Sequence, residues 1–111
     1  MKKKYRLLKN DDFRRVIGKQ RFFSNQAFSL YYFKNDLQHL RLGISVGHKF
    51  GNAVERNKAK RQVRMMVSQN MNLEMSIDIV LMIRKGYQKD NYDSNCQKLL
   101  QLYEKVKGKV E

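Results

Sequence analysis

The residues best suited to chemistry in this sequence are a dense group of cations between positions 56 and 64. They are Arg56, Lys58, Lys60, Arg61 and Arg64. Arginine can donate to a phosphate in a planar fork, whereas lysine acts as a point charge. Glu55 is the only acidic residue nearby, so the segment offers little internal ion pairing. Cations held on one rigid element form a fixed footprint for a phosphate backbone, and the segment therefore predicts a nucleic-acid contact.

The whole sequence is strongly basic. It has 24 lysines and arginines against 10 aspartates and glutamates in 111 residues, which gives a formal net charge of +14. Such an excess causes self-repulsion in the folded state, so a polyanionic partner is its best explanation. Hydrophobic residues make up 41% and aromatic residues 11% of the sequence, enough for a folded core.

The sequence also indicates where the protein works. Cys96 is the only cysteine, so no intrachain disulfide can form and a reducing compartment is expected. No apolar run has the length of a signal peptide, and none approaches the roughly 18 residues of a membrane span. We therefore expect a cytoplasmic protein with no membrane role and no obligate protein partner.

Hydrophobic periodicity predicts one domain over residues 1–111, with seven elements in the order α-β-β-β-α-β-α. The expected helices cover residues 10–17, 53–70 and 92–106, and the expected strands cover residues 21–24, 27–34, 40–47 and 77–83. The cluster Asn10-Asp11-Asp12 is expected to cap the first helix, and Asn52 the second. Residues 40–47 are expected to pair antiparallel with residues 27–34 through the connection at 35–39. In the last helix, Leu99, Leu102, Tyr103 and Val106 form the apolar stripe.

The central helix is predicted to have a basic face and a packing face. At about 100° per residue, the outward arc spans roughly 140°. It contains Arg56, Asn57, Lys60, Arg61 and Arg64. The opposite side carries Ala59, Val63, Met66 and Asn70, and Lys58 falls on the far flank. The helix is therefore expected to pack on a sheet while it points its cations outward.

Longer blocks of the sequence resemble the protein subunit of bacterial ribonuclease P. Arg56-Asn57-Lys58 is close to that family's Arg-Asn-Arg signature. The resemblance also includes Leu-Lys-Asn-Asp-Asp-Phe at 8–13, Phe-Ser-Leu-Tyr at 28–31, Arg-Leu-Gly-Ile-Ser-Val at 41–46 and the block at 49–57. It extends over roughly residues 7 to 84, and its long ordered central block makes it specific.

This resemblance implies an α+β sandwich with a mixed four-stranded sheet and a left-handed β-α-β crossover that carries the basic helix. It implies a subunit that binds a catalytic RNA and the 5′ leader of precursor tRNA, with the catalytic centre and its Mg²⁺ on the RNA. The implied contacts to the catalytic RNA are Lys49, Arg56, Asn57, Lys58, Lys60, Arg61 and Arg64. The implied leader cleft is Phe13, Ile17, Ser29 and Tyr31.

The sequence departs from the family pattern at three places. Lys58 replaces the third signature arginine, Ile17 stands where a second phenylalanine is common, and Gly47-His48 replaces Ser-Lys. No protein catalytic site is visible, since His39 and His48 lack partners at metal-ligand spacing. A ribosomal or general RNA-binding protein is the alternative, because it shares the size, charge and basic helix but has no need of the leader cleft.

Overall fold

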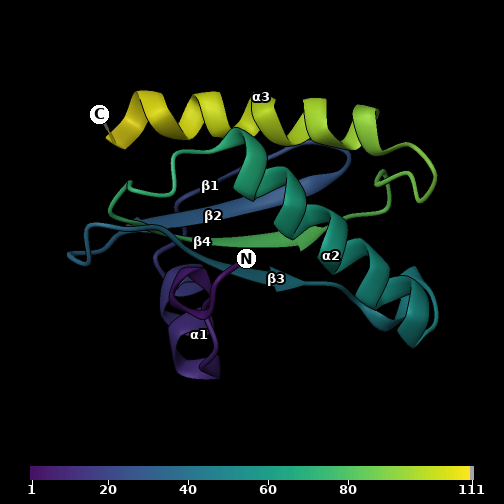
Figure 1. The fold of residues 1–111 in the computed structure, drawn as a ribbon, viewed down its shortest axis with the longest axis horizontal. Helices are drawn as coiled ribbons and strands as arrows, with labels where there is room; N and C mark the ends of the chain where they lie inside the picture. The colour runs from purple at the N-terminus through teal and green to yellow at the C-terminus, as the bar shows by residue number, and fades with distance from the viewer. Residues whose placement is uncertain (111) are drawn as a thin grey trace.

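The computed structural model describes residues 1–110 (Figure 1). Its helices are α1 (Asn10–Gly18), α2 (Ala53–Asn70) and α3 (Tyr92–Val110), with short 3-10 helices η1 (Lys3–Tyr5) and η2 (His48–Phe50). Its strands are β1 (Phe22–Ser24), β2 (Phe28–Lys34), β3 (Arg41–Ser45) and β4 (Ile77–Ile83). Apart from the 3-10 helices, this is the predicted order of elements. The single domain expected over 1–111 stays a prediction, and its last residue lies outside the described range.

The four strands form one mixed sheet in the order β1-β2-β4-β3. β4 pairs antiparallel with β2 and parallel with β3. The predicted antiparallel pairing of residues 40–47 with 27–34 is therefore wrong, because β4 lies between them. β4 is the most apolar strand and its first five residues are all buried, so it is stable only at the centre, where both its faces are covered.

Helix α2 forms the crossover between the adjacent parallel strands β3 and β4. Most such crossovers are right-handed. The left hand implied by the family resemblance stays a prediction.

The two faces of the sheet carry cores of different size. On one face, Leu30, Tyr32, Ile79 and Leu81 pack with buried residues of α2 and α3 in the main core. On the other face, β4 contributes Val80 to a small cluster beneath α1. Figure 1 shows α1 apart from the pair α2 and α3. One face is thus fully covered, while the other is covered only where α1 crosses it.

The helix ends follow the predictions in part. Asn52 is the N-cap of α2, as predicted, and forms a capping box with Glu55. The N-cap of α1 is Lys9, which makes no side-chain cap. The helix begins at residue 10, as predicted, but Asn10, Asp11 and Asp12 form its first turn, so their predicted role as the cap is wrong. There the carboxylates of Asp11 and Asp12 still favour the positive end of the helix dipole.

Helix α3 runs to Val110, four residues beyond its predicted end at 106. The predicted stripe is confirmed, since all four of its residues are buried. Lys107 and Lys109 in the last turn favour the extension of α3 beyond residue 106, because cations stabilise the negative end of a helix dipole.

A buried carboxylate on β4 holds α1 against the sheet. Asp78 has no exposed surface and accepts hydrogen bonds from Arg41 at 2.7 and 2.9 Å, from Arg15 at 2.6 Å and from Asn35 at 2.8 Å. Burial by itself would raise the pKa of Asp78, but the bonds from Arg41, Asn35 and Arg15 hold it below its usual value. Asp78 raises the pKa of Arg41 in turn. This network joins α1, β3 and the β2–β3 connection to the central strand.

Replacing Asp78 with alanine is expected to lower the free energy of unfolding by about 3 kcal/mol, because two arginines lose the carboxylate that neutralises them. Urea denaturation followed by circular dichroism measures this loss. The exposed Asp36, in the β2–β3 connection, offers a matched control, and Asp36→Ala should change stability by less than about 0.5 kcal/mol.

The pH dependence of the free energy of unfolding gives a second measurement of the Asp78 network. Because folding lowers the pKa of Asp78, its contribution is complete above the ordinary aspartate value of about 4 and is lost as the pH falls through the lower folded-state pKa. The Asp78→Ala protein should therefore lose less stability than the wild type over this acid range. Parallel pH profiles for the two proteins would contradict the assignment.

Candidate nucleic-acid interface

Helix α2 is held at a defined rotation by its cap and its buried residues. The Asn52 Oδ1 accepts the Glu55 backbone N–H at 2.9 Å, and the Asn52 N–H donates to Glu55 Oε1 at 3.1 Å. The buried residues of the helix are Ala59, Val63, Met66 and Val67. Asn70, predicted on the packing side, is exposed and donates to the Met66 carbonyl at 2.9 Å. It ends the helix, where its amide can bond back to the preceding turn.

The predicted outward arc is a surface of unpaired cations. Asn57 and Arg61 are exposed, while Arg56, Lys60 and Arg64 are half-buried. Within residues 1–110, none of the cations of this helix forms an ion pair with a carboxylate. The Arg56 Nη1 donates to the Gly51 carbonyl at 2.7 Å, which fixes this side chain across the start of the helix. The arc therefore offers positive charge that the described residues leave uncompensated.

Arg6 adds to this surface from a distant part of the sequence. The segment around it is bridged to β3, with the Leu7 N–H donating to the Leu42 carbonyl at 2.8 Å. Burial lowers the pKa of Arg64, and repulsion from Arg6 and Arg61 lowers it further. The Arg6 Nε is buried and has no hydrogen-bond partner among the described residues. Arg6 and Arg61 thus form a cluster around Arg64, and a bound phosphate would relieve the repulsion on Arg64.

Sequence reasoning missed Arg6. Helical periodicity relates only residues of the same helix, and Arg6 reaches the cluster through the bridge to β3. The basic N-terminal run was the available signal, but nothing in it distinguishes Arg6 from the neighbouring lysines.

Lys49 and Lys58 line two neighbouring cavities that none of the three clustered arginines lines. Lys49 is exposed in η2 and lines a cavity of about 300 Å³ together with Arg84, Lys85 and Lys89. Lys58 lines a neighbouring cavity of about 140 Å³ between α2 and the loop after β4. Two of the seven predicted RNA-facing residues thus lie beside the loop that follows β4.

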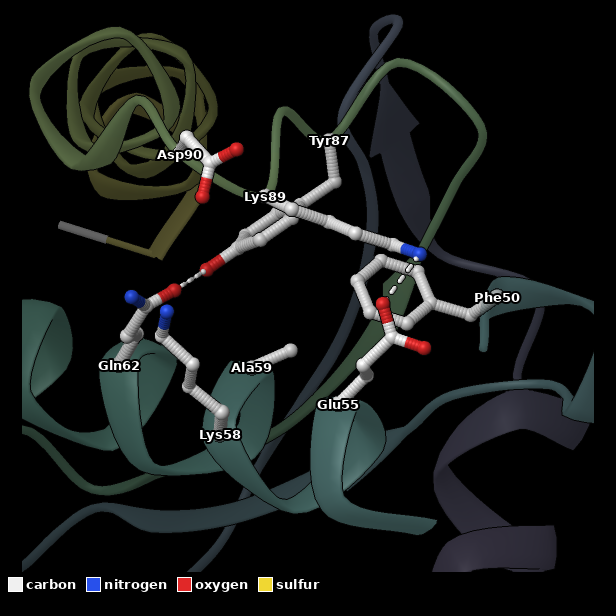
Figure 2. A pocket seen from close by; sticks show the side chains of 8 residues that line it. All are labelled: Phe50, Glu55, Lys58, Ala59, Gln62, Tyr87, Lys89 and Asp90. Carbon is white, nitrogen blue, oxygen red and sulfur yellow. Dashed lines mark hydrogen bonds and ion pairs between the residues drawn. The ribbon is translucent and has the colours of Figure 1, made fainter. Parts of the chain in front are cut away.

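Two polar contacts lie along the wall of the cavity beside Lys58 (Figure 2). The Tyr87 hydroxyl donates to Gln62 Oε1 at 2.7 Å, and burial raises the Tyr87 pKa to about 12. The Lys89 amine donates to Glu55 Oε2 at 2.9 Å and lies 4.9 Å from the Phe50 ring centroid. The bond from Lys89, followed by that from Asn52, lowers the pKa of Glu55. These contacts join the start of α2 to the loop after β4, so the capping carboxylate is already engaged.

The predicted cleft residues lie on the half-covered face of the sheet. Phe13, Ile17 and Tyr31 are half-buried and pack against a small cluster formed by Leu7, Val16 and Val80. The structure thus brings three of the four together. Ser29 lies outside this cluster, and its Oγ is 2.9 Å from the Ser24 Oγ on β1.

The position of Phe13 depends on a glycine in β3. A Cβ added at Gly43 would lie 2.5 Å from the Phe13 Cζ, so only glycine lets this ring lie against the strand. Phe13 also lines a cavity of about 380 Å³ with Ser45 and with Lys60 of α2. This cavity makes the aromatic face of the sheet continuous with the basic surface of the helix.

Among residues 1–110, no group of three or more His, Cys, Asp or Glu side chains could hold a metal ion. No helix in that range is long and apolar enough to cross a membrane. The arginines can contact phosphates, and the partly exposed rings can stack on bases.

Known proteins resemble this chain over nearly its whole length. The Ribonuclease P family model matches residues 1–107. The ribonuclease P protein component of Mesoplasma florum is 46% identical over 104 residues, covering 92% of this chain and 94% of that protein. The ribonuclease P protein component of Streptococcus agalactiae is 34% identical, and the match covers 99% of this chain and 100% of that protein.

Solved structures show the same relationship. The RNase P protein of Staphylococcus aureus superimposes with a TM-score of 0.82 at 33% identity, covering 93% of this chain and 95% of that one. The RNase P protein of Thermotoga maritima superimposes with a TM-score of 0.80 at 32% identity, covering 90% of this chain and 96% of that one. This chain therefore belongs to the ribonuclease P protein component family.

Proposed function

We propose that this chain, as the subunit of a tRNA-processing ribonucleoprotein endoribonuclease, binds the catalytic RNA through α2 and the 5′ leader of precursor tRNA on the α1 side of the sheet. The observation that carries the proposal is the uncompensated arginine cluster of Arg6, Arg61 and Arg64, set beside an open aromatic face. Lys60 and Phe13 line one cavity, so one RNA assembly can contact both surfaces.

The arginine cluster supports contact with folded RNA. Each cation that neutralises a phosphate releases a condensed counterion, which makes binding strongly dependent on salt. The cluster lies across α2 and the segment bridged to β3, and both are fixed by backbone hydrogen bonds. The cations therefore keep their spacing before RNA arrives, so little conformational entropy is lost on binding.

The half-covered face of the sheet supports contact with a single strand. Exposed rings provide stacking surfaces for bases of any sequence, which suits leaders whose sequences differ. Phe13 and Tyr31 both retain exposed surface on that face. The chain then promotes cleavage by positioning the leader, while the catalytic RNA carries out the chemistry.

Mg²⁺ is proposed to bind phosphates of the RNA. The only fully buried carboxylate among the described residues, Asp78, is neutralised by Arg15 and Arg41 and has no free role as a ligand. The net charge of +14 reduces repulsion between RNA strands, so less Mg²⁺ should be needed when the protein is bound. A cytoplasmic site of action belongs to the same proposal.

The direct test is 5′ cleavage of a precursor tRNA by a bacterial ribonuclease P RNA at near-physiological Mg²⁺, with and without this protein. We expect strong stimulation that is lost in a variant carrying both Arg61→Ala and Arg64→Ala. RNA binding without stimulation would favour the alternative of a general RNA-binding protein.

Arg6→Ala and Arg64→Ala are each expected to weaken binding to the catalytic RNA and to reduce the slope of log affinity against log salt by about one unit, because each removes one phosphate contact. Filter binding over a salt series measures the slope. Lys109→Ala, at the exposed end of α3, removes the same charge away from the cluster and should leave the slope unchanged. Equal slopes for all three variants would rule out the cluster as the contact.

Phe13→Leu is expected to reduce the preference for precursor over mature tRNA by about fivefold, since leucine keeps apolar volume but offers no ring for stacking. Binding of both tRNAs to the holoenzyme measures the ratio. Affinity for mature tRNA should stay near the wild-type value. A loss of the same size for both tRNAs would mean that Phe13 supports the fold and does not contact the leader.

A further inference from the structure

The half-covered face of the sheet has a row of residues with aromatic rings at both ends, and this row reaches the sheet edge at β1. Strand register places one residue from each strand in line, namely Gly43 of β3, Val80 of β4, Tyr31 of β2 and Phe22 of β1. The Phe13 ring lies against Gly43 at one end of the row. Phe22 stands at the other end, on the edge strand. A phenylalanine ring therefore lies at each end of the row, and Val80 between them is buried beneath α1.

Phe22 extends the stacking surface of Tyr31. The two ring centroids are 4.8 Å apart with an interplanar angle of 29°. Phe22 is 47% exposed, which is high for a residue of its size. Its neighbour Phe23 points to the opposite face, where it packs against the main core and stacks on Tyr32. Core packing thus accounts for Phe23 but leaves much of the Phe22 ring in contact with solvent.

The next row on this face holds three serines and one methionine, and it lies beyond the cluster under α1. It consists of Ser45, Met82, Ser29 and Ser24. Ser24 and Ser45 are exposed, and Ser29 and Met82 are half-buried. Hydroxyl groups beside an aromatic row provide donors and acceptors for sugar and phosphate oxygens. Because Val80 in the middle of the first row is buried beneath α1, the strand would run beside α1 along the serine row, with its bases against the rings of the first row.

Positive charge is concentrated at the same edge. Lys19 and Arg21 lie 4.7 and 5.7 Å from the centroid of Phe33, on the face that carries Tyr31. Within the described residues, neither cation is in an ion pair. The phosphates next to a base stacked on Phe22 would therefore lie near cations that no carboxylate neutralises.

We infer that Phe22 is the outermost stacking platform for the single-stranded leader, which crosses the sheet from Phe13 to β1. The inference rests on the proposed function and deepens it. Three inter-strand spacings separate the ends of the row, or about 14 Å. The leader bases stack on rings in turn, and the base at Phe22 occupies the face of that ring that Tyr31 leaves free. Because stacking tolerates any base, Phe22 sets the length of leader that is recognised and does not select its sequence.

The test is a leader-length series, in which precursor tRNAs with leaders lengthened one nucleotide at a time bind the assembled holoenzyme. For the wild type, affinity should rise with length and then reach a plateau. For Phe22→Ala, the plateau should come at a shorter leader, and affinity for the longest leaders should fall by about fivefold. Mature tRNA and the shortest leaders should bind as they do to the wild type.

Matched variants separate stacking from other effects. Phe22→Tyr keeps an aromatic ring and should retain the wild-type plateau, whereas Phe22→Leu should behave as Phe22→Ala. Leu37→Ala removes a side chain that is 42% exposed in the β2–β3 connection and should leave the series unchanged. Recovery with leucine would show a general apolar contact and overturn the stacking assignment.

The outcomes distinguish the role of Phe22 from the proposed binding of the leader itself. If wild-type affinity depends on leader length and Phe22→Ala gives the same curve, Phe22 is not a platform, while leader binding stands. If the wild type shows no dependence on leader length, leader binding itself fails. Circular dichroism of each variant confirms that the fold is retained, and the Phe22→Tyr comparison still tests the inference if alanine unfolds the edge strand.

Discussion

The buried charge of Asp78 is the constraint on which the rest of the structure depends. A carboxylate with no exposed surface, in the central strand, is stable only when it is fully neutralised and hydrogen-bonded. Arg15 and Arg41 meet this requirement from α1 and from β3. Because Arg15 must reach Asp78, α1 lies over one end of the sheet face and leaves the other end open. The serine row and the exposed parts of the aromatic rings lie beside α1 because of that placement.

One face of the sheet carries the main hydrophobic core, and the other leaves side chains exposed for binding. The face under α2 and α3 holds most of the buried apolar residues and provides most of the hydrophobic stabilisation. That core also fixes the rotation of α2, which determines where its cations point. The opposite face has only a small cluster beneath α1 and can therefore leave rings exposed. A protein with one strong core can keep a second surface available for RNA.

Electrostatic repulsion links stability to function in this chain. The described residues leave the cations of α2 without carboxylate partners, and Arg64 is held near two other arginines. This arrangement is unfavourable in the free protein and becomes favourable when phosphates lie between the cations. Glu55 could have neutralised the start of the helix, but its carboxylate accepts the Asn52 N–H and pairs with Lys89 on the other flank. The acidic group nearest the basic face is thus kept away from it.

The sequence by itself determined the elements and the basic face of α2, because helical and strand periodicity, capping and charge density are local properties. The bounds of α2 and the buried stripe of α3 were predicted from such patterns. Only the tertiary structure decided that β4 separates β2 from β3, that Arg6 joins Arg64, and that Phe22 continues the row from Tyr31. These facts depend on which strands share hydrogen bonds, and that choice is made by the burial of the whole sheet and not by any local run of residues.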